Sequence, residues 1–254
     1  RARLLLRVSF RSPGAVVDLS RKFGCDPEDA MQLARLAAKL GIDVQGFSFH
    51  VGSQAADALK HVEAIEVCTR LLAAARREKL GSLDTLDIGG GFPGTDNAKV
   101  AFESMAEVIN TAIDELFADN PVVQFMAEPG RYFVASSHTI ICSIINKKEK
   151  MDAETGEMNY TYYISDGVYK SFSNTIYDYA NPEFIPFNER NEKTYHSILY
   201  GESCDSLDII SRGCQLPSLA IGESIVVKNM GAYTTASSTE FNGFSKAELY
   251  YILT

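Results

Sequence analysis

Four short apolar runs recur along the first half of the chain, about 40 residues apart, and each is expected to form a strand. They cover residues 4–8, 44–50, 83–88 and 122–127. Both faces of these runs are apolar, which is typical of strands in a parallel sheet that is covered on both sides. Amphipathic segments fill the intervals and predict helices over 27–40, 61–79 and 96–117. Consecutive strand–helix units of this kind predict a parallel sheet with right-handed crossovers.

From residue 133 the pattern changes to short β-like segments separated by turns rich in Pro, Gly and Asp. The expected strands cover 133–145, 160–164, 195–200, 224–229 and 249–253, and the polar stretch 149–159 is expected to be a surface loop. We therefore predict an α/β fold with two domains. A βα domain covers 1–132, and a separate, mostly antiparallel β domain covers 133–254.

Composition narrows the classes of function. The 254 residues are 46% hydrophobic and 22% charged, as in globular proteins, and the net charge of −9 argues against nucleic acid and anionic membranes as partners. No apolar run reaches the ~20 residues that span a bilayer and no signal peptide is visible, so we expect a cytoplasmic protein. Five cysteines without a CxxC pair favour reduced thiols over disulfides or a metal site. Because the chain opens without Met, almost inside a strand, we expect it to be a fragment.

Three consecutive glycines, Gly89, Gly90 and Gly91, follow the third predicted strand. Without Cβ atoms, they can bring backbone N–H groups against an anion at the point where a strand leads into a helix. A tight turn without any ligand is the alternative that the glycines alone leave open. Their spacing matches neither the dinucleotide fingerprint nor the Lys-containing P-loop, so a nucleotide-binding fold is disfavoured.

Polar side chains interrupt the apolar strands at their carboxyl ends, at Arg7, His50, Ser53, Glu128 and Arg131. Considered singly, Arg7 and Glu128 could belong to structural ion pairs, and His50 could be an ordinary core histidine. Considered together, their positions match the active-site face of a parallel α/β barrel, where βα loops and helix N-termini converge.

The residue types at these strand ends suit a planar, cationic, phosphorylated ring. Backbone N–H groups of Gly90 and Gly91 can bind a phosphate together with a hydroxyl and a guanidinium, which Ser53 and Arg131 supply. A flat histidine would lie beside the ring, and a carboxylate such as Glu128 would keep a pyridine nitrogen protonated. Pyridoxal phosphate fits this description.

Seven motifs carry a family resemblance. They are FSFHVGS (47–53), LDIGGGFPG (86–94), AEPGRY (127–132), SDGVYKSF (165–172), YDYANP (177–182), CDSLD (204–208) and GAYT with FNGF (231–244). In this order they resemble the eukaryotic-type ornithine decarboxylases, of the alanine-racemase-like pyridoxal-phosphate fold. The resemblance implies the second half of a TIM (β/α)8 barrel followed by the β domain. It also places the Schiff-base lysine upstream of Arg1, so this chain alone is not expected to catalyse.

The resemblance implies which residues hold the cofactor. His50 stacks on the ring, Glu128 meets the pyridine nitrogen, and Arg7 lies near the ring. The phosphate is held by Ser53, Gly90, Gly91, Arg131 and Tyr233, with Gly89 beside them. Together with Cys204, the residues His50 and Glu128 form the implied catalytic set.

The resemblance also implies a head-to-tail homodimer with shared active sites. Cys204 and Asp205 enter the neighbouring subunit's site, where Cys204 protonates the product carbanion and Asp205 binds the distal ammonium of the substrate. Asp178 binds the same ammonium from the other subunit. Tyr177 and Phe241 line the pocket.

The implied activity is decarboxylation of L-ornithine to putrescine for polyamine synthesis, because a substrate with a terminal cation needs carboxylates such as Asp178 and Asp205. Decarboxylation of lysine or arginine stays open, since one methylene or a guanidinium head changes little in the sequence. A non-catalytic role like that of the antizyme inhibitors, which bind a regulatory partner, is also open, although such a chain would not need Cys204. A racemase or cofactor carrier would not need the paired carboxylates.

Two residues depart from the family pattern. Glu202 stands where the family usually has proline, which leaves the stiffness of the loop before Cys204 open. Lys170 stands where the family commonly has a small residue, and we expect its side chain to face the solvent.

Overall fold

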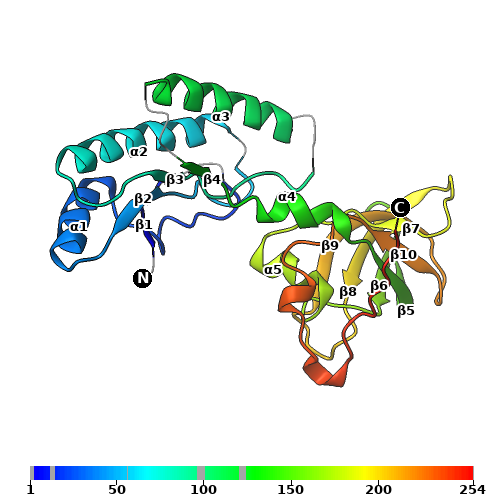
Figure 1. Cartoon of the computed structure of the whole chain (residues 1–254). Helices are drawn as coiled ribbons and strands as arrows, with labels where there is room; N and C mark the ends of the chain where they lie inside the picture. The colour runs from blue at the N-terminus through cyan, green and yellow to red at the C-terminus, as the bar shows by residue number, and fades with distance from the viewer. Residues whose placement is uncertain (1–2, 12–14, 56, 96–100, 120–123, 254) are drawn as a thin grey trace. The chain divides into compact units, whose positions relative to one another are not determined.

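The computed structural model describes residues 3–11, 15–55, 57–95, 101–119 and 124–253, and it divides into two compact units, Arg1–Phe133 and Val134–Thr254. Each unit has its own hydrophobic core and its own sheet (Figure 1). Among the described residues, no helix combines the length and the apolar character that crossing a bilayer requires.

A four-stranded parallel sheet forms the centre of the first unit, in the order β1-β2-β3-β4. Its elements are β1 (Leu4–Arg7), α1 (Pro27–Lys39), β2 (Val44–Ser48), α2 (Leu59–Arg77), β3 (Thr85–Asp87), α3 (Phe102–Phe117) and β4 (Gln124–Met126). The predicted alternation of strands and helices is confirmed. The predicted helix start at Asp96 and residues 122–123 of the fourth strand lie outside the described residues.

Helix α2 packs between α1 and α3 and against β2 (Figure 1). Its apolar side chains Ile65 and Leu72 share a buried cluster with Phe47 of β2 and Leu86 of β3. Burying an aliphatic or aromatic side chain of this size is worth roughly 1.5–3 kcal/mol, so this cluster fixes the strands against the helix layer. The strand ends are thereby held in place. The closed eight-stranded barrel stays a prediction.

The second unit is built on a six-stranded sheet in the order β7-β10-β5-β6-β8-β9. Its strands are β5 (Ile140–Met151), β6 (Met158–Ile164), β7 (Ile185–Pro186), β8 (Thr194–Tyr200), β9 (Ile209–Pro217) and β10 (Ser224–Val227). All of its pairings are antiparallel except that of β6 with β8. Short helical segments connect them: α4 (Gly130–Val134), which begins in the first unit, η1 (Ala135–Ser137), η2 (Ser171–Ser173), α5 (Asn174–Tyr177), η3 (Thr235–Ser237) and η4 (Phe241–Gly243).

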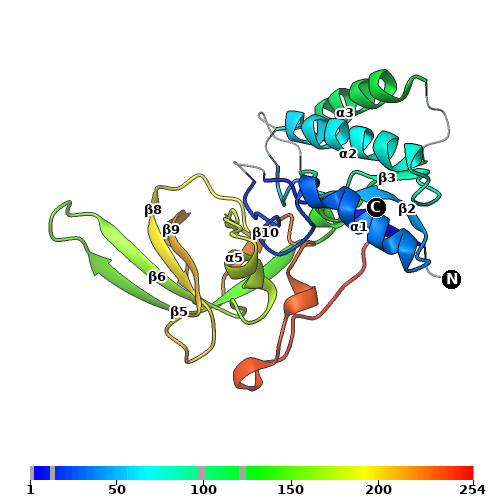
Figure 2. The same ribbon diagram turned by 90° about the vertical axis from the view of Figure 1, so that its left-hand side faces the viewer.

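The predicted surface loop over 149–159 is too long: residues 152–157 form the turn of the β5–β6 hairpin, whereas 149–151 belong to β5 and 158–159 to β6 (Figure 2). Lys147 forms an ion pair with Glu149 at 2.7 Å, and its ammonium lies 5.4 Å from the centre of the Tyr160 ring across the hairpin. The charged side chains that suggested a loop therefore lie along paired strands, where backbone hydrogen bonds and cross-strand contacts stabilise them.

Three further strand predictions need correction. The first part of 133–145 is helical, in α4 and η1, and Pro129 directly precedes α4 at a position that favours a helix start. Residues 249–253 lie outside the strands of the described chain, and their side chains are exposed, because they have no strand partner there. Strand β9 was missed, since Ser211, Arg212 and Gly213 interrupt its apolar pattern.

Candidate active site

The predicted site residues of the first unit lie at the carboxyl ends of β1 to β4. Arg7 pairs with Ser48, Ser48 with Asp87, and Asp87 with Met126, so the four strands end at the same level. The chain segments that follow them therefore begin side by side. We call this region the strand-end site.

Gly89 lies against the ends of three strands, β2, β3 and β4. Its N–H donates to Asp87 Oδ1 at 2.8 Å, and its carbonyl accepts from Glu128 N at 2.8 Å. Its φ is +66°, and a Cβ at this position would lie 2.0 Å from the Phe49 carbonyl oxygen. Only glycine fits here without moving the backbone.

His50 presents a flat ring against the next glycine. A Cβ on Gly90 would lie 2.7 Å from His50 Nε2, so the glycine allows the close approach. Gly52 N donates to His50 Nδ1 at 3.0 Å, and the neutral ring therefore carries its proton on Nε2. Burial, followed by the positive charge of Arg7, lowers the pKa of His50, which favours this neutral form.

Ser53 and Arg131 form the polar cradle that the sequence predicts for a phosphate. Arg131 Nη2 donates to Ser53 Oγ at 2.8 Å. Ser53 is held by main-chain bonds in both directions, since its N–H donates to Val17 O at 3.0 Å and its carbonyl accepts from Val16 N at 3.1 Å. A guanidinium and a hydroxyl fixed in this way are suitable donors for an anion.

Glu128 follows β4 and shares its surroundings with Asp87, whose side chain is buried. Burial, and then the negative charge of Asp87, raise the pKa of Glu128, while Arg7 acts in the opposite direction. A cation bound beside Glu128 would offset this repulsion. The carboxylate thus lies where a protonated ring nitrogen would be stabilised.

Cys204 and Asp205 lie in the second unit, in the loop between β8 and β9. The Cys204 thiol is exposed, and both its Sγ and its N–H donate to Asn242 Oδ1 at 3.3 Å. Asp205 Oδ1 accepts from Leu207 N at 2.9 Å, and Asp205 Oδ2 accepts from the Tyr169 hydroxyl. These bonds lower the pKa of Asp205, with Leu207 as the larger cause, and the Asp205 carboxylate raises the pKa of Tyr169 to about 12.

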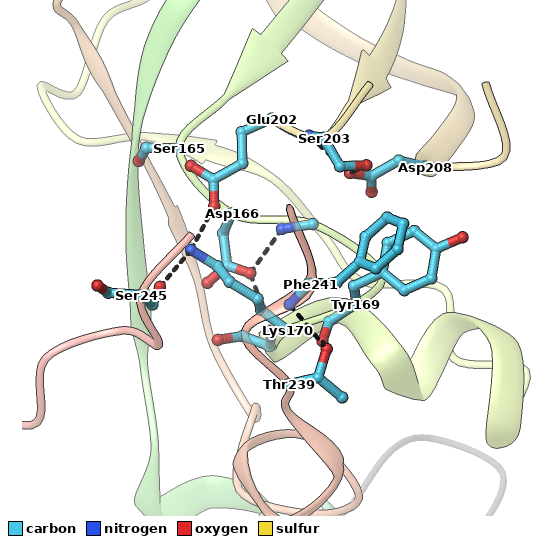
Figure 3. Close-up of polar contacts among 12 residues, drawn as sticks. Ser165, Asp166, Tyr169, Lys170, Glu202, Ser203, Asp208, Thr239, Phe241 and Ser245 are labelled. Carbon is cyan, nitrogen blue, oxygen red and sulfur yellow. Dashed lines mark hydrogen bonds and ion pairs between the residues drawn. The ribbon is translucent and has the colours of Figure 1, made fainter. Parts of the chain in front are cut away.

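The remaining predicted residues also lie in the second unit and differ in exposure. Asp178 follows α5 and is only 4% exposed, whereas Tyr177 beside it is exposed. Phe241 packs against Tyr169 with the ring centres 4.2 Å apart and the ring planes tilted by 35°. Figure 3 shows the two rings next to each other. Tyr233 has a φ of +57°. Convergence of these residues with the strand-end site stays a prediction.

Residues 1–135 match the family model for the pyridoxal binding domain of pyridoxal-dependent decarboxylases. The chain belongs to this family. Mouse ornithine decarboxylase is 39% identical over 264 residues, and antizyme inhibitor 2 of Xenopus laevis is 40% identical over 260 residues. These matches cover 100% and 99% of this chain but 57% of each relative, so the chain spans little more than half the length of these curated relatives.

Solved decarboxylase structures match both units. The arginine decarboxylase of Paramecium bursaria Chlorella virus aligns with a TM-score of 0.88 and 31% identity over 98% of this chain and 66% of its own. The lysine/ornithine decarboxylase of Vibrio vulnificus, complexed with cadaverine, aligns with a TM-score of 0.83 and 36% identity over 96% of this chain and 62% of its own. The predicted family membership is therefore confirmed.

Pyridoxal phosphate is the cofactor of the family, and the strand-end site of this chain fits it. The close approach between Gly90 and His50 leaves no room for a Cβ, Ser53 and Arg131 supply donors for a phosphate, and Glu128 supplies a carboxylate for the ring nitrogen. The predicted cofactor is confirmed, and the role of each residue remains a prediction.

Several residues that contact the candidate site residues were not predicted from the sequence. Asp87 and His61 contact the glycines, His61 through Nε2, which lies 3.2 Å from Gly90 O. Tyr169 and Asn242 contact Asp205 and Cys204. Asp87 could have been found as a polar residue at a strand end, but His61 looks like an ordinary helix residue and the other two contacts join distant loops.

Proposed function

We propose that the complete protein decarboxylates L-ornithine to putrescine with pyridoxal phosphate. The observation that carries this proposal is the strand-end site, where a neutral histidine, a carboxylate and an Arg–Ser pair surround three glycines at level strand ends. The names of the curated relatives favour ornithine, and the solved structures extend the candidates to arginine and lysine.

The chain's own residues would bind, orient and protonate the substrate. When bound, pyridoxal phosphate supplies an electron sink for the loss of carbon dioxide. Asp205, which keeps its charge because its pKa is lowered, would attract the distal ammonium of the substrate together with Asp178. The Cys204 thiol would deliver the proton to the α-carbon that has lost carbon dioxide.

The assay compares carbon dioxide release from ornithine, lysine and arginine by the complete protein loaded with pyridoxal phosphate. We expect kcat/KM to be highest for ornithine. A higher value for lysine or arginine would overturn the substrate assignment but keep the reaction class. Binding of pyridoxal phosphate without release of carbon dioxide from any of the three would favour the second candidate, a non-catalytic role like that of antizyme inhibitor 2.

The phosphate cradle is tested by Arg131→Met. Loss of a charged hydrogen bond of about 1.5–3 kcal/mol should raise the Kd for pyridoxal phosphate about 10- to 100-fold, measured by absorbance titration. Arg35→Met removes an arginine of the same unit whose partner is Glu78 on the surface, and it serves as the matched control. Equal Kd values for both variants would contradict the assignment of Arg131.

Sharing of the active site between subunits of a homodimer is a separate part of this proposal. Arg131→Met weakens cofactor binding in one half of the site, and Asp205→Ala weakens substrate binding in the other, so each variant alone should have little activity at limiting concentrations of cofactor and ornithine. If the two halves come from different subunits, mixed dimers contain one intact site, and an equimolar mixture should recover roughly a quarter of the wild-type activity. A mixture that stays as inactive as the single variants would contradict the shared site.

A further inference from the structure

Lys170 and Glu202, the two departures from the family pattern, form an ion pair with each other. Their side chains are 8% and 12% exposed, so the expectation that Lys170 faces the solvent is wrong. Figure 3 shows the two side chains meeting between the segment after β6 and the loop after β8. Each charge alone would be strongly unfavourable at this buried position, so the two side chains depend on each other.

Lys170 also reaches a third segment. Its Nζ donates to the Ser245 carbonyl oxygen at 2.9 Å (Figure 3). The ammonium therefore joins three loops, residues 165–178, 201–208 and 239–245. Each of these loops carries predicted catalytic or substrate-binding residues, and we refer to them below as the three site loops.

The neighbouring residue, Tyr169, joins the same three site loops by other contacts. Its hydroxyl donates to Asp205, and its carbonyl oxygen accepts from Thr239 N at 2.9 Å and from Thr239 Oγ1 at 3.0 Å. Two consecutive residues thus connect the loops by independent contacts. Tyr169 holds Asp205 directly, whereas Lys170 holds Glu202, which lies two residues before Cys204.

The charges explain why the two departures occur together. A lysine at position 170 without Glu202, or a glutamate at 202 without Lys170, would leave a charge buried without its partner. A proline at position 202, which is usual in the family, would restrict the loop through its fixed φ. In this chain the restriction comes from a side-chain contact that reaches across to Ser245.

We propose that Lys170 and Glu202 are positioning residues for proton delivery. Their ion pair fixes the loop 201–208 against Ser245. This restraint keeps the Cys204 thiol in its contact with Asn242 Oδ1 and so in one orientation. This inference rests on the proposed function, since Cys204 is the proton donor there. Its physical part, the restraint of the Cys204 loop by the ion pair, is independent of activity.

The test compares Lys170→Met, Lys170→Arg and the double variant Lys170→Met/Glu202→Met in the complete protein. The activity readout is putrescine formed per carbon dioxide released. A misplaced Cys204 thiol would not deliver its proton to the α-carbon, although loss of carbon dioxide does not require that thiol. The independent readout is the rate at which iodoacetamide alkylates Cys204, followed by peptide mass spectrometry. Lys193→Met, which breaks the exposed ion pair with Glu157 at 2.9 Å, is the matched control.

We expect Lys170→Met to lower the yield of putrescine per carbon dioxide about tenfold and to raise the alkylation rate of Cys204 at least about threefold. Lys170→Arg should stay near wild type. The double variant removes both charges, so it should be more thermally stable than Lys170→Met, which leaves Glu202 buried without its partner. It should keep the low yield and the fast alkylation, because the connection between the loops is still missing. Lys193→Met should change none of these values.

Two results would overturn the inference. A double variant with wild-type yield and wild-type alkylation would mean that Lys170→Met acts only through its unpaired glutamate. Unchanged alkylation in a folded Lys170→Met variant would mean that the pair does not restrain the loop. If the wild type releases no carbon dioxide from any basic amino acid, the proposed function fails, while the alkylation rates still test the restraint.

Discussion

In the first unit the backbone of Gly89 joins strand ends, whereas in the second unit the side chains of Tyr169 and Lys170 join loops. Gly89 connects three strand ends through its own N–H and carbonyl groups and through the space that its missing Cβ leaves. Tyr169 and Lys170 connect three loops through a hydroxyl and an ammonium. The difference teaches that a substitution at Gly89 should act mainly on the fold, and substitutions at Tyr169 or Lys170 on the position of reactive groups.

Gly89→Ala should have the largest effect. The new Cβ would lie 2.0 Å from Phe49 O at a φ of +66°, so the strand ends must separate. We expect a loss of roughly 4 kcal/mol in the free energy of unfolding, measured by chemical denaturation, together with loss of pyridoxal phosphate binding.

Gly156→Ala provides the matched control for this prediction. Gly156 has nearly the same φ, +68°, but nothing lies within 4 Å of a Cβ built there, in the turn of the β5–β6 hairpin. This variant should lose only about 1 kcal/mol, the cost of the left-handed conformation. Equal losses for the two variants would mean that backbone conformation, and not the close approach of strand ends, makes Gly89 necessary.

His61 should give the first unit a distinct dependence on pH. This histidine is fully buried behind Gly90, and burial lowers its pKa from 6.5 to about 4. Between these pH values the unfolded chain takes up a proton that the folded chain does not. The free energy of unfolding should therefore fall as the pH drops from about 6.5 to about 4, by up to about 3 kcal/mol, and level off below.

His61→Phe should remove that part of the pH dependence. The ring of Phe fits the same aromatic surroundings, where Phe92 lies 5.2 Å and Phe49 6.3 Å away between ring centres. His196→Gln, in which the histidine is exposed on β8, is the control and should leave the slope unchanged. If His61→Phe keeps the full slope, other groups cause it.

The parallel sheet of the first unit and the grouping of its strand-end residues could be predicted from the sequence. The period of about 40 residues predicted the parallel sheet, and parallel strands must end at one edge, so His50 and Glu128 could be grouped without coordinates. The predictions failed where charged residues lie on paired strands, as in the β5–β6 hairpin around Lys147. The charged residues there suggest a loop, but backbone pairing between β5 and β6 makes them part of two strands.

The contacts of the second unit could not be predicted, because they join residues far apart in the chain. Lys170 and Glu202 are separated by 32 positions, and in the sequence they stand as two unrelated departures from the family pattern. Only the fold of the loops shows that they are a pair. Asn242 lies within the FNGF motif, but the motif alone does not show that its side chain contacts Cys204.

Tyr169→Phe should have the smallest effect, because it tests a single hydrogen bond among the three site loops. The variant keeps the ring that packs against Phe241 and the carbonyl oxygen that accepts from Thr239, and it removes only the hydroxyl that donates to Asp205. Asp205 would keep the bond from Leu207 N, which is the larger cause of its lowered pKa, so the carboxylate stays charged at neutral pH.

We therefore expect a rise of about threefold in the KM for ornithine with little change in kcat, because Asp205 is loosened but not neutralised. Tyr169→Leu removes the ring as well, so it should also lower kcat, since Phe241 loses its packing partner. If Tyr169→Phe lowers kcat as strongly as Tyr169→Leu, the hydroxyl does more than position Asp205. If it leaves KM unchanged, the Leu207 N–H alone holds the carboxylate, and the three site loops depend on Lys170 more than on Tyr169.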